Sequence, residues 1–263
     1  MRMDEPGFAD RPSSARIYDA LLGGSHNFAA DRAAAQRLLA AIPNAGEMAR
    51  RNREFLHRAV EHMLAAGVRQ FLDIGSGIPT VGNVHEVTAR TAPDATVVYV
   101  DIDPVAVAHS RDILAGSRVA TAVQADARFP AELLAHPEVA GLLDFDRPIG
   151  LLLVSMLHFL PDEDAYPAVR SLLAALPSGS YLAISHGVLE TPADASTEEV
   201  AAIYRRTDVA VAAGRTRAQI RSFFDGTTLE PPGLVWLHEW PSPPPDGDQS
   251  ELMAVLAGVG RVP

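Results

Sequence analysis

The segment FLDIGSGIPT, at residues 71–80, constrains the fold more than any other part of the sequence. A short apolar run ends on Asp73 and is followed at once by Gly75, Ser76 and Gly77. In an open parallel sheet, ligands bind beyond the carboxyl ends of the strands, and a glycine turn there lets the backbone approach the ligand closely. The segment therefore predicts a strand, a ligand-binding turn and a following helix, which together form one unit of a doubly wound α/β sheet.

From Val68 onward, short β-branched runs alternate with helix-sized segments, a pattern typical of a parallel sheet. The five predicted strands are Gln70–Ile74, Thr96–Asp101, Arg118–Gln124, Ile149–Ser155 and Ser180–His186. Helices are expected near residues 196–213 and 216–224. Two later apolar runs, Leu234–Trp240 and Glu251–Val259, flank the turn-rich segment PSPPPDGDQS and predict an antiparallel hairpin at the sheet edge. We therefore expect an α/β fold with a mostly parallel, doubly wound sheet of seven strands.

The first 67 residues are predicted to be mostly helical. Ser13 and Ser14 precede ARIYDALLGG as helix-capping residues, and Gly23–Gly24 ends that short helix. Further helices are expected at about 29–41 and 45–66. We expect residues 1–67 to form a helical arm that covers the ligand site of a domain at residues 68–263.

Composition excludes several classes of function. The chain contains no cysteine, so disulfides, thiolate zinc sites and cysteine nucleophiles are excluded, and the histidines lack the spacing of a metal site such as H-E-x-x-H. The net charge is −11 and no basic stripe is present, so nucleic acid is not expected as a partner. No apolar run approaches the roughly 20 residues that a bilayer requires, and the polar start of the sequence lacks a signal peptide. A cytoplasmic protein that does not contact the membrane is therefore expected.

Two ligand classes fit the glycine turn, dinucleotides and S-adenosylmethionine. The next strand ends VVYVDID, which places Asp101 where a carboxylate can accept hydrogen bonds from both ribose hydroxyls. The dinucleotide fingerprint requires a third glycine or alanine, but Thr80 stands there. Asp73 also suits a ligand with a cationic sulfonium and an ammonium better than one with a pyrophosphate. The pattern favours S-adenosylmethionine, with an NAD(P)-dependent oxidoreductase as the alternative.

A third acidic residue, Asp126, follows the third strand in VQADAR. It can accept a hydrogen bond from the exocyclic amine of adenine. The alternative is that Asp126 only caps the following helix.

With these motifs the sequence resembles the class I, Rossmann-like methyltransferases. More narrowly, it resembles a largely actinobacterial family of S-adenosyl methyltransferases once catalogued as a domain of unknown function. The resemblance covers about residues 13 to 240. It rests on the segments ARIYDALLGGSHNFAADR, NREFLHRAV, QFLDIGSGIPT, VYVDIDPVAVAH, DAR, MLHFLPD and RSFFDGTTLEPPGLV. The implied fold is Rossmann-like, the implied cofactor is S-adenosyl-L-methionine, and the implied reaction is methyl transfer.

The resemblance also implies roles for individual residues. Gly75 and Gly77 would approach the methionine and ribose, Asp101 would bind the ribose hydroxyls, and Asp126 would bind adenine. The cofactor-binding residues expected around them are Tyr18, Gly24, Asn27 and Arg53 at the methionine end, Ile102 and Ala127 beside the adenine ring, and Asp73, Ser76 and Ser155 at the strand ends. For the arm, the alternative is that Asn27 and Asp31 cap the second helix while Tyr18 packs in a core.

Methyl transfer from a sulfonium is an in-line displacement, so the protein mainly aligns the reactants and excludes water. For a hydroxyl or amine acceptor a general base helps, and His158 is the candidate because SMLHFLPD follows the fourth strand. His186 and His26 are weaker candidates, and His158 could instead make a structural hydrogen bond. We expect a small or medium-sized metabolite with an oxygen or nitrogen nucleophile as the acceptor. The other alternative to a methyltransferase is a non-catalytic module that binds S-adenosylmethionine. A homodimer is a possible assembly.

Overall fold

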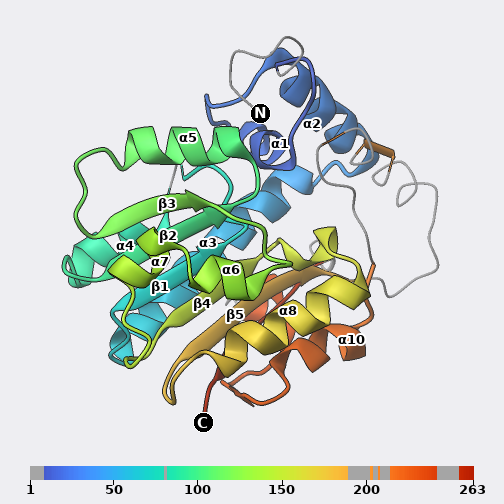
Figure 1. Cartoon of the computed structure of the whole chain (residues 1–263). Helices are drawn as coiled ribbons and strands as arrows, with labels where there is room; N and C mark the ends of the chain where they lie inside the picture. The colour runs from blue at the N-terminus through green and yellow to red at the C-terminus, as the bar shows by residue number, and fades with distance from the viewer. Residues whose placement is uncertain (1–8, 80–81, 189–201, 204–206, 208–213, 242–254) are drawn as a thin grey trace.

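The structure, a computed structural model, describes residues 9–79, 82–188, 202–203, 207, 214–241 and 255–263. Their strands form one eight-stranded sheet in the order β3-β2-β1-β4-β5-β8-β6, with β7 also paired to β8 (Figure 1). The strands are β1 (Gln70–Ile74), β2 (Thr96–Asp101), β3 (Ala120–Gln124), β4 (Gly150–Val154), β5 (Tyr181–Gly187), β6 (Thr228–Leu229), β7 (Val235–Trp236) and β8 (Val255–Arg261).

The first five strands are parallel, which confirms the predicted doubly wound sheet. Strand β1 lies between β2 and β4, so the strand order reverses at β1, and the crevice beyond its carboxyl end is the expected ligand site of such a sheet. The five predicted parallel strands begin and end within two residues of their expected ends. Ser155, predicted as the last residue of the fourth strand, lies just beyond β4.

The antiparallel strands predicted at the sheet edge are present. Strand β8 runs antiparallel to β5 along one side, and β6 and β7 pair with its other side at two residues each. The expected run Leu234–Trp240 therefore contributes only Val235–Trp236 to the sheet, and residues 251–254 of the other run lie outside the described residues. Because β6 and β7 share the seventh position, the sheet has eight strands where seven were predicted.

The helices of the described chain include the three predicted for the arm. They are α1 (Ser14–Leu21), α2 (Ala29–Ala41), α3 (Ala45–Ala65), α4 (Val84–Thr91), α5 (Pro104–Ile113), α6 (Pro130–Leu134), α7 (Pro137–Leu142), α8 (Asp162–Ala174) and α10 (Arg217–Arg221), with short 3-10 turns η1 (Leu157–Phe159), η2 (Ser222–Phe224) and η3 (Leu237–Glu239). The helix expected near residues 216–224 appears as α10 continued by η2. The helix expected at 196–213 falls almost entirely outside the described residues.

Both faces of the sheet are covered by helices, as the apolar strands require. Because side chains alternate along a strand, neighbouring residues of β1 enter different cores: Phe71 packs with Phe55 of α3, and Leu72 packs with Leu172 of α8. Helices α3, α4 and α5 contribute to the first core, whereas α6, α7, α8 and η2 contribute to the second. The helices thus form two layers with the sheet between them.

Helices α1 and α2 form a small separate core around Ile17, Ala34 and Leu38. They lie together at the end of the molecule opposite the C-terminus (Figure 1). Helix α3 instead places Phe55 and Met63 in the first of the two cores that flank the sheet. The division of the chain at residue 67 stays a prediction.

Candidate active site

The glycine turn after β1 adopts a backbone that other residues rarely adopt. The φ angles of Gly75 and Gly77 are +71° and +63°. A Cβ atom on Gly75 would lie 2.5 Å from Cβ of Met156, so only glycine fits there. The N–H groups of Gly75 and Ser76 both donate to the carbonyl oxygen of Val100, at 2.8 and 3.1 Å. The turn is therefore held against the end of β2.

Asp101, the last residue of β2, is oriented by two backbone donors. Its Oδ2 accepts a hydrogen bond from Gly77 N–H at 2.7 Å, and its Oδ1 accepts one from Asp103 N–H at 2.9 Å. A carboxylate oxygen has more than one lone pair, so each oxygen can accept a further hydrogen bond. Asp101 and the glycine turn thus lie together, as the motif predicted.

Asp73, the next-to-last residue of β1, carries a buried carboxylate. Within the described residues no hydrogen bond to this carboxylate is present. Burial raises the pKa of Asp73 to about 7, against the opposing charge of Arg53 and with a smaller contribution from the neighbouring carboxylate of Asp101. A buried carboxylate with so little hydrogen bonding can accept a cation.

Tyr18 of α1 packs near Arg53 of α3, whose guanidinium lies 5.7 Å from the centre of the Tyr18 ring. The Tyr18 hydroxyl donates to the carbonyl oxygen of Ala49 at 3.0 Å and accepts from Asn52 Nδ2 at 3.0 Å. Arg53 donates to Oδ1 of Asn83 at 3.2 Å. The two predicted residues are therefore neighbours, and both have partners within the protein.

A chain of hydrogen bonds continues from Asn52 to the ends of β4 and β5. Ser185 donates to Oδ1 of Asn52 at 2.6 Å, and its own Oγ accepts from Ser155 N–H at 3.0 Å. Ser155 has a φ of +55°, which is uncommon for a residue with a side chain. Sequence reasoning missed Asn52 and Ser185. The available signal was a polar residue, Asn52, on the apolar stripe of α3.

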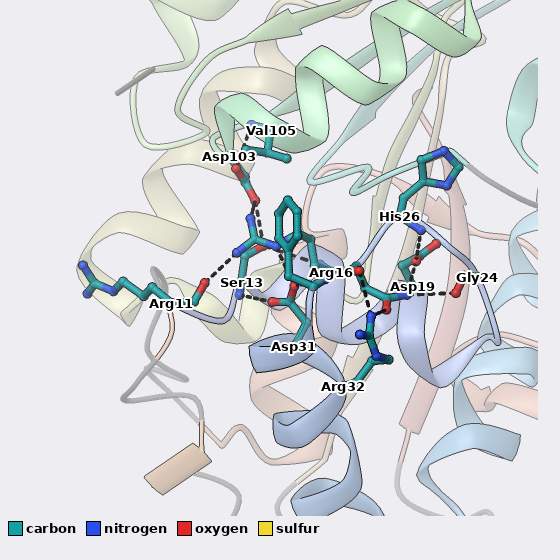
Figure 2. A network of polar contacts seen from close by, with 12 residues as sticks. Arg11, Ser13, Arg16, Asp19, Gly24, His26, Asp31, Arg32, Asp103 and Val105 are labelled. Carbon is teal, nitrogen blue, oxygen red and sulfur yellow. Dashed lines mark hydrogen bonds and ion pairs between the residues drawn. The ribbon is translucent and has the colours of Figure 1, made fainter. Parts of the chain in front are cut away.

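The loop between α1 and α2 is held by hydrogen bonds to the side chain of Asp19 (Figure 2). Oδ2 of Asp19 accepts from His26 N–H at 2.9 Å and from Nδ2 of Asn27 at 2.8 Å, and Asn27 also donates to the carbonyl oxygen of Gly24. A Cβ atom on Gly24 would lie 2.0 Å from Oδ1 of Asp19, so glycine is required there. Gly24 and Asn27 are thus explained within the arm, and their contact with a cofactor stays a prediction.

The residues predicted around adenine lie after β2 and β3. Ile102 is 43% exposed, and Ala127 packs at the margin of the second core. Asp126 accepts two hydrogen bonds from Nε of Arg128, at 2.9 and 3.0 Å, and one from Arg128 N–H. Although burial acts to raise the pKa of Asp126, these bonds lower it overall. Phe129, which the sequence reasoning missed, is 52% exposed beside this turn.

His158 lies in η1, two residues after Met156 in the sequence. Met156 is the residue whose side chain lies against Gly75 of the glycine turn. Its ring is 5.6 Å from that of His186, and its Nδ1 is a buried atom with no hydrogen-bond partner in the described part of the chain. Burial, with smaller contributions from His186 and Arg215, lowers the pKa of His158 to about 3. The imidazole is therefore neutral at physiological pH.

Arg215 joins this histidine pair to the turn that carries His158. The guanidinium is fully buried and donates to Nε2 of His186 at 2.9 Å and to the carbonyl oxygens of Leu157 and Leu160, both at 2.8 Å. It also pairs with Asp162 at the start of α8. Sequence reasoning missed Arg215, because nothing in the segment RTRAQ separates a buried arginine from an exposed one.

Among the described residues, the His, Asp and Glu side chains form no group of three or more arranged to hold a metal ion. None of the helices in this part of the chain combines the length and the apolar character needed to cross a bilayer.

The chain is similar to a family of proteins and to two solved structures over nearly all of its length. The family model described as S-adenosyl methyltransferase matches residues 7–263. The chain belongs to this family. A Thermobifida fusca YX protein classed provisionally as a methyltransferase is 39% identical over 100% of this chain and 99% of that one, with a TM-score of 0.90.

A DUF574 family protein from Streptomyces avermitilis MA-4680 is 40% identical to this methyltransferase over 97% of this chain and 99% of that one, with a TM-score of 0.89. TehB from Haemophilus influenzae shares the fold at 11% identity, covering 78% of this chain and 61% of that one, with a TM-score of 0.50. No curated protein matches the chain.

The cofactor of the family, S-adenosylmethionine, suits the residues present in this methyltransferase. The carboxylate oxygens of Asp101 are of the kind that accepts hydrogen bonds from ribose hydroxyls, and Gly77 itself brings no side chain to the turn. The buried carboxylate of Asp73 complements the positive charge at the methionine end. Ile102 and Phe129 offer exposed apolar surface to an aromatic ring. The donors, the charges and the open turn therefore fit a sulfonium nucleoside.

Proposed function

We propose that this methyltransferase transfers a methyl group to an oxygen or nitrogen nucleophile of a small or medium-sized metabolite, with His158 as the group that orients the acceptor. The observation that carries this proposal is the neutral imidazole of His158, whose Nδ1 has no partner among the described residues. When bound, S-adenosylmethionine supplies an electrophilic methyl group on a cationic sulfur that is already a good leaving group. The tasks left to the chain are alignment, exclusion of water and removal of one proton.

His158 suits the last of these tasks for an oxygen acceptor. A methylated oxygen that still carries its proton is a far stronger acid than an imidazolium, so even a buried imidazole with a pKa of about 3 can take that proton. Before transfer, the lone pair of the neutral ring accepts a hydrogen bond from the acceptor hydroxyl and aligns its oxygen. A methylated nitrogen is a weaker acid, and we expect it to lose its proton to water instead.

The position of His158 supports this role. Met156, two residues earlier, lies against Gly75, so the η1 turn starts beside the glycine turn. Arg215 holds both ends of η1 through the carbonyl oxygens of Leu157 and Leu160. The imidazole is thus carried by a short, braced turn and not by a free loop.

The net charge of −11 supports a metabolite and not a nucleic acid as the acceptor. The proposed place of action is the cytoplasm, and an actinobacterial source stays a prediction. A homodimer also stays a prediction, which the mass measured by light scattering would test.

The first test is a calorimetric titration with S-adenosylmethionine, S-adenosylhomocysteine and NADH in parallel. A ligand that binds only the native state adds about 2.7 kcal/mol of stability at a hundredfold excess over its Kd, so a matching rise in Tm checks each titration. Binding of the first two ligands alone supports the proposal. Binding of NADH alone would refute it in favour of an oxidoreductase.

The second test incubates the enzyme with methyl-labelled S-adenosylmethionine and a panel of phenols, hydroxy acids, amines and N-heterocycles, and follows label in the product. Transfer to a phenol or hydroxy acid that falls in His158→Gln supports the proposed role of the imidazole. Tight cofactor binding without transfer to any member of a broad panel would favour the non-catalytic module.

A further inference from the structure

Three helices begin at one buried point where the arm meets the turn between β2 and α5. Ser13 is the N-cap of α1, Asp31 lies in the first turn of α2, and Asp103 is the N-cap of α5. Each residue accepts a hydrogen bond from a backbone N–H at its own helix start, from Arg16, Phe28 and Val105 respectively. The partial positive charge of each helix N-terminus is thereby satisfied locally.

Arg16 lies between the two carboxylates at this point (Figure 2). Its Nε is 2.8 Å from Oδ2 of Asp31, and its Nη1 is 3.4 Å from Oδ2 of Asp103. The shorter link to Asp103 comes from Ser13, whose hydroxyl donates to the same Oδ2 at 2.6 Å. All four side chains are at most 4% exposed, so water does not compete for these bonds.

The link from the arm to the ribose carboxylate is only two hydrogen bonds long. Ser13 fixes the side chain of Asp103, and the backbone N–H of Asp103 donates to Oδ1 of Asp101. The arm also lies near Gly77, whose N–H is the second donor to Asp101, because a Cβ atom built on Gly77 would lie 3.8 Å from Cβ of Ala15. One of the two groups that orient Asp101 is therefore hydrogen-bonded to the arm through its own side chain, and the other lies near the arm.

We propose that Ser13 and Arg16 are positioning residues for cofactor binding, because they hold Asp103 and thereby orient the ribose-binding carboxylate of Asp101. Docking of the arm and binding of the cofactor then stabilise each other. This inference rests on the proposed role of Asp101 as the ribose ligand. It goes beyond a lid that merely covers the site, since it assigns the coupling to the contacts that Ser13 and Arg16 make with Asp103.

The side chain of Asp103 has two separable tasks, which allows a sharp variant. Asp103→Ser keeps a good N-cap for α5 but is too short to reach Ser13. Ser13→Ala removes the hydroxyl from the other side, and Ser13→Thr retains it. Arg37→Gln, at an exposed position of α2 away from these residues, is the matched arm control.

The measurement is the Kd of S-adenosylhomocysteine for the full chain by calorimetry. We expect Ser13→Ala and Asp103→Ser each to weaken binding about 3- to 10-fold, the effect of one lost hydrogen bond. The double variant should lose less affinity than the product of the two single losses, because both changes break the bond between residues 13 and 103. Ser13→Thr and Arg37→Gln should bind as the wild type does. Wild-type affinity in both single variants, or losses that multiply in the double variant, would overturn the inference.

Hydrogen exchange separates positioning from a general loss of structure. The amides of Ser13 and Phe28 both donate to Asp31 and report on the arm. S-adenosylhomocysteine should slow their exchange in the wild type and leave it unchanged in Asp103→Ser. Equal slowing in both proteins contradicts the coupling. If the wild-type protein binds no S-adenosylhomocysteine at all, the proposed function fails, and this result differs from every outcome that tests the coupling.

Discussion

Arg215 donates a hydrogen bond to Nε2 of His186 at 2.9 Å, while Nδ1 of the same ring faces the carbonyl oxygen of Gly187. Because a guanidinium can only donate, Nε2 must be the acceptor, and the proton of the neutral imidazole lies on Nδ1. Arg215 and the carbonyl oxygen of Gly187 thus require the same tautomer of His186, and Arg215 also braces the turn that carries His158.

We predict that Arg215→Met lowers the free energy of unfolding by about 2–4 kcal/mol, because two buried carbonyl oxygens lose their donor. The variant should also raise the pKa values of His158 and His186, since the charge of Arg215 lowers both. Denaturant titration and histidine NMR measure the two effects. Arg221→Met, at an exposed position of α10, is the control and should change stability by less than about 0.5 kcal/mol. Unchanged pKa values of both histidines in Arg215→Met would contradict this assignment.

The raised pKa of Asp73 predicts a stability that depends on pH in the cofactor-free protein. The pKa is about 7 in the folded chain and about 3.9 for an unperturbed aspartate. The folded state therefore binds the extra proton between about pH 4 and 7, and the contribution of this group to stability is lost as pH rises through 7. Asp73→Asn should remove this fall, which urea unfolding from pH 5 to 8 would reveal. Parallel pH profiles in the two proteins would rule the assignment out.

Cofactor binding should show the opposite dependence on pH. A cationic methionine end binds the ionised carboxylate, and at pH 6 only about a tenth of Asp73 is ionised if its pKa is 7. The Kd of S-adenosylhomocysteine should therefore be up to about tenfold higher at pH 6 than at pH 8. Calorimetry in two buffers of different ionisation enthalpy measures the proton released. Asp73→Asn is expected to bind weakly and without this release, and an unchanged proton release in that variant would count against the role of Asp73.

Asp101→Ala should weaken cofactor binding by about 1–3 kcal/mol, the cost of removing a buried hydrogen-bonding partner. The substitution also leaves the N–H groups of Gly77 and Asp103 without their acceptor. Calorimetry with S-adenosylhomocysteine provides the measurement, and Asp94→Ala, at an exposed position before β2, provides the control. Equal affinities of the two variants would mean that the ribose lies elsewhere.

His158→Gln should leave the Kd of the cofactor within about threefold of wild type and lower turnover of a hydroxyl acceptor by about 10²- to 10⁴-fold. Because the pKa of His158 is about 3, its protonation should not limit the rate between pH 5 and 8. Any acidic limb of the rate profile in that range should instead follow Asp73. A limb near pH 6.5 that disappears in His158→Gln would show that the imidazole is more basic in the working enzyme.

The parallel sheet could be predicted from the sequence because its signals are local. Runs such as Gln70–Ile74 are bounded by turn residues, and each is followed by a helix-sized segment. The glycine turn and Asp101 could likewise be placed together, since carboxyl ends of adjacent parallel strands lie at the same edge. The pairing of β8 with β7 was predicted as the edge hairpin, whereas the insertion of β8 between β5 and the short strands β6 and β7 was not, because β5 lies far away in the sequence.

Site residues that lie within one sequence motif could be predicted. Residues whose role depends on a partner from a distant segment could not. The roles of Ser13 and Arg16 depend on Asp103, and that of Asn52 depends on Ser185. No local pattern links such pairs, because each residue alone reads as an ordinary cap or a polar position on a helix. Arg215 was missed for the same reason, since its partners on η1 and β5 come from earlier in the chain.

The meeting of three helix starts at Arg16 has a consequence for the order of folding. Helices α1 and α2 leave the ribosome before Asp103 has been synthesised, and at 5–20 residues per second the delay is on the order of 10 s. During that time Asp31 can pair with Arg16, but α1 has no β2–α5 turn on which to dock. The arm should therefore complete its folding only after the central strands have formed, and in the finished protein it should open before they do.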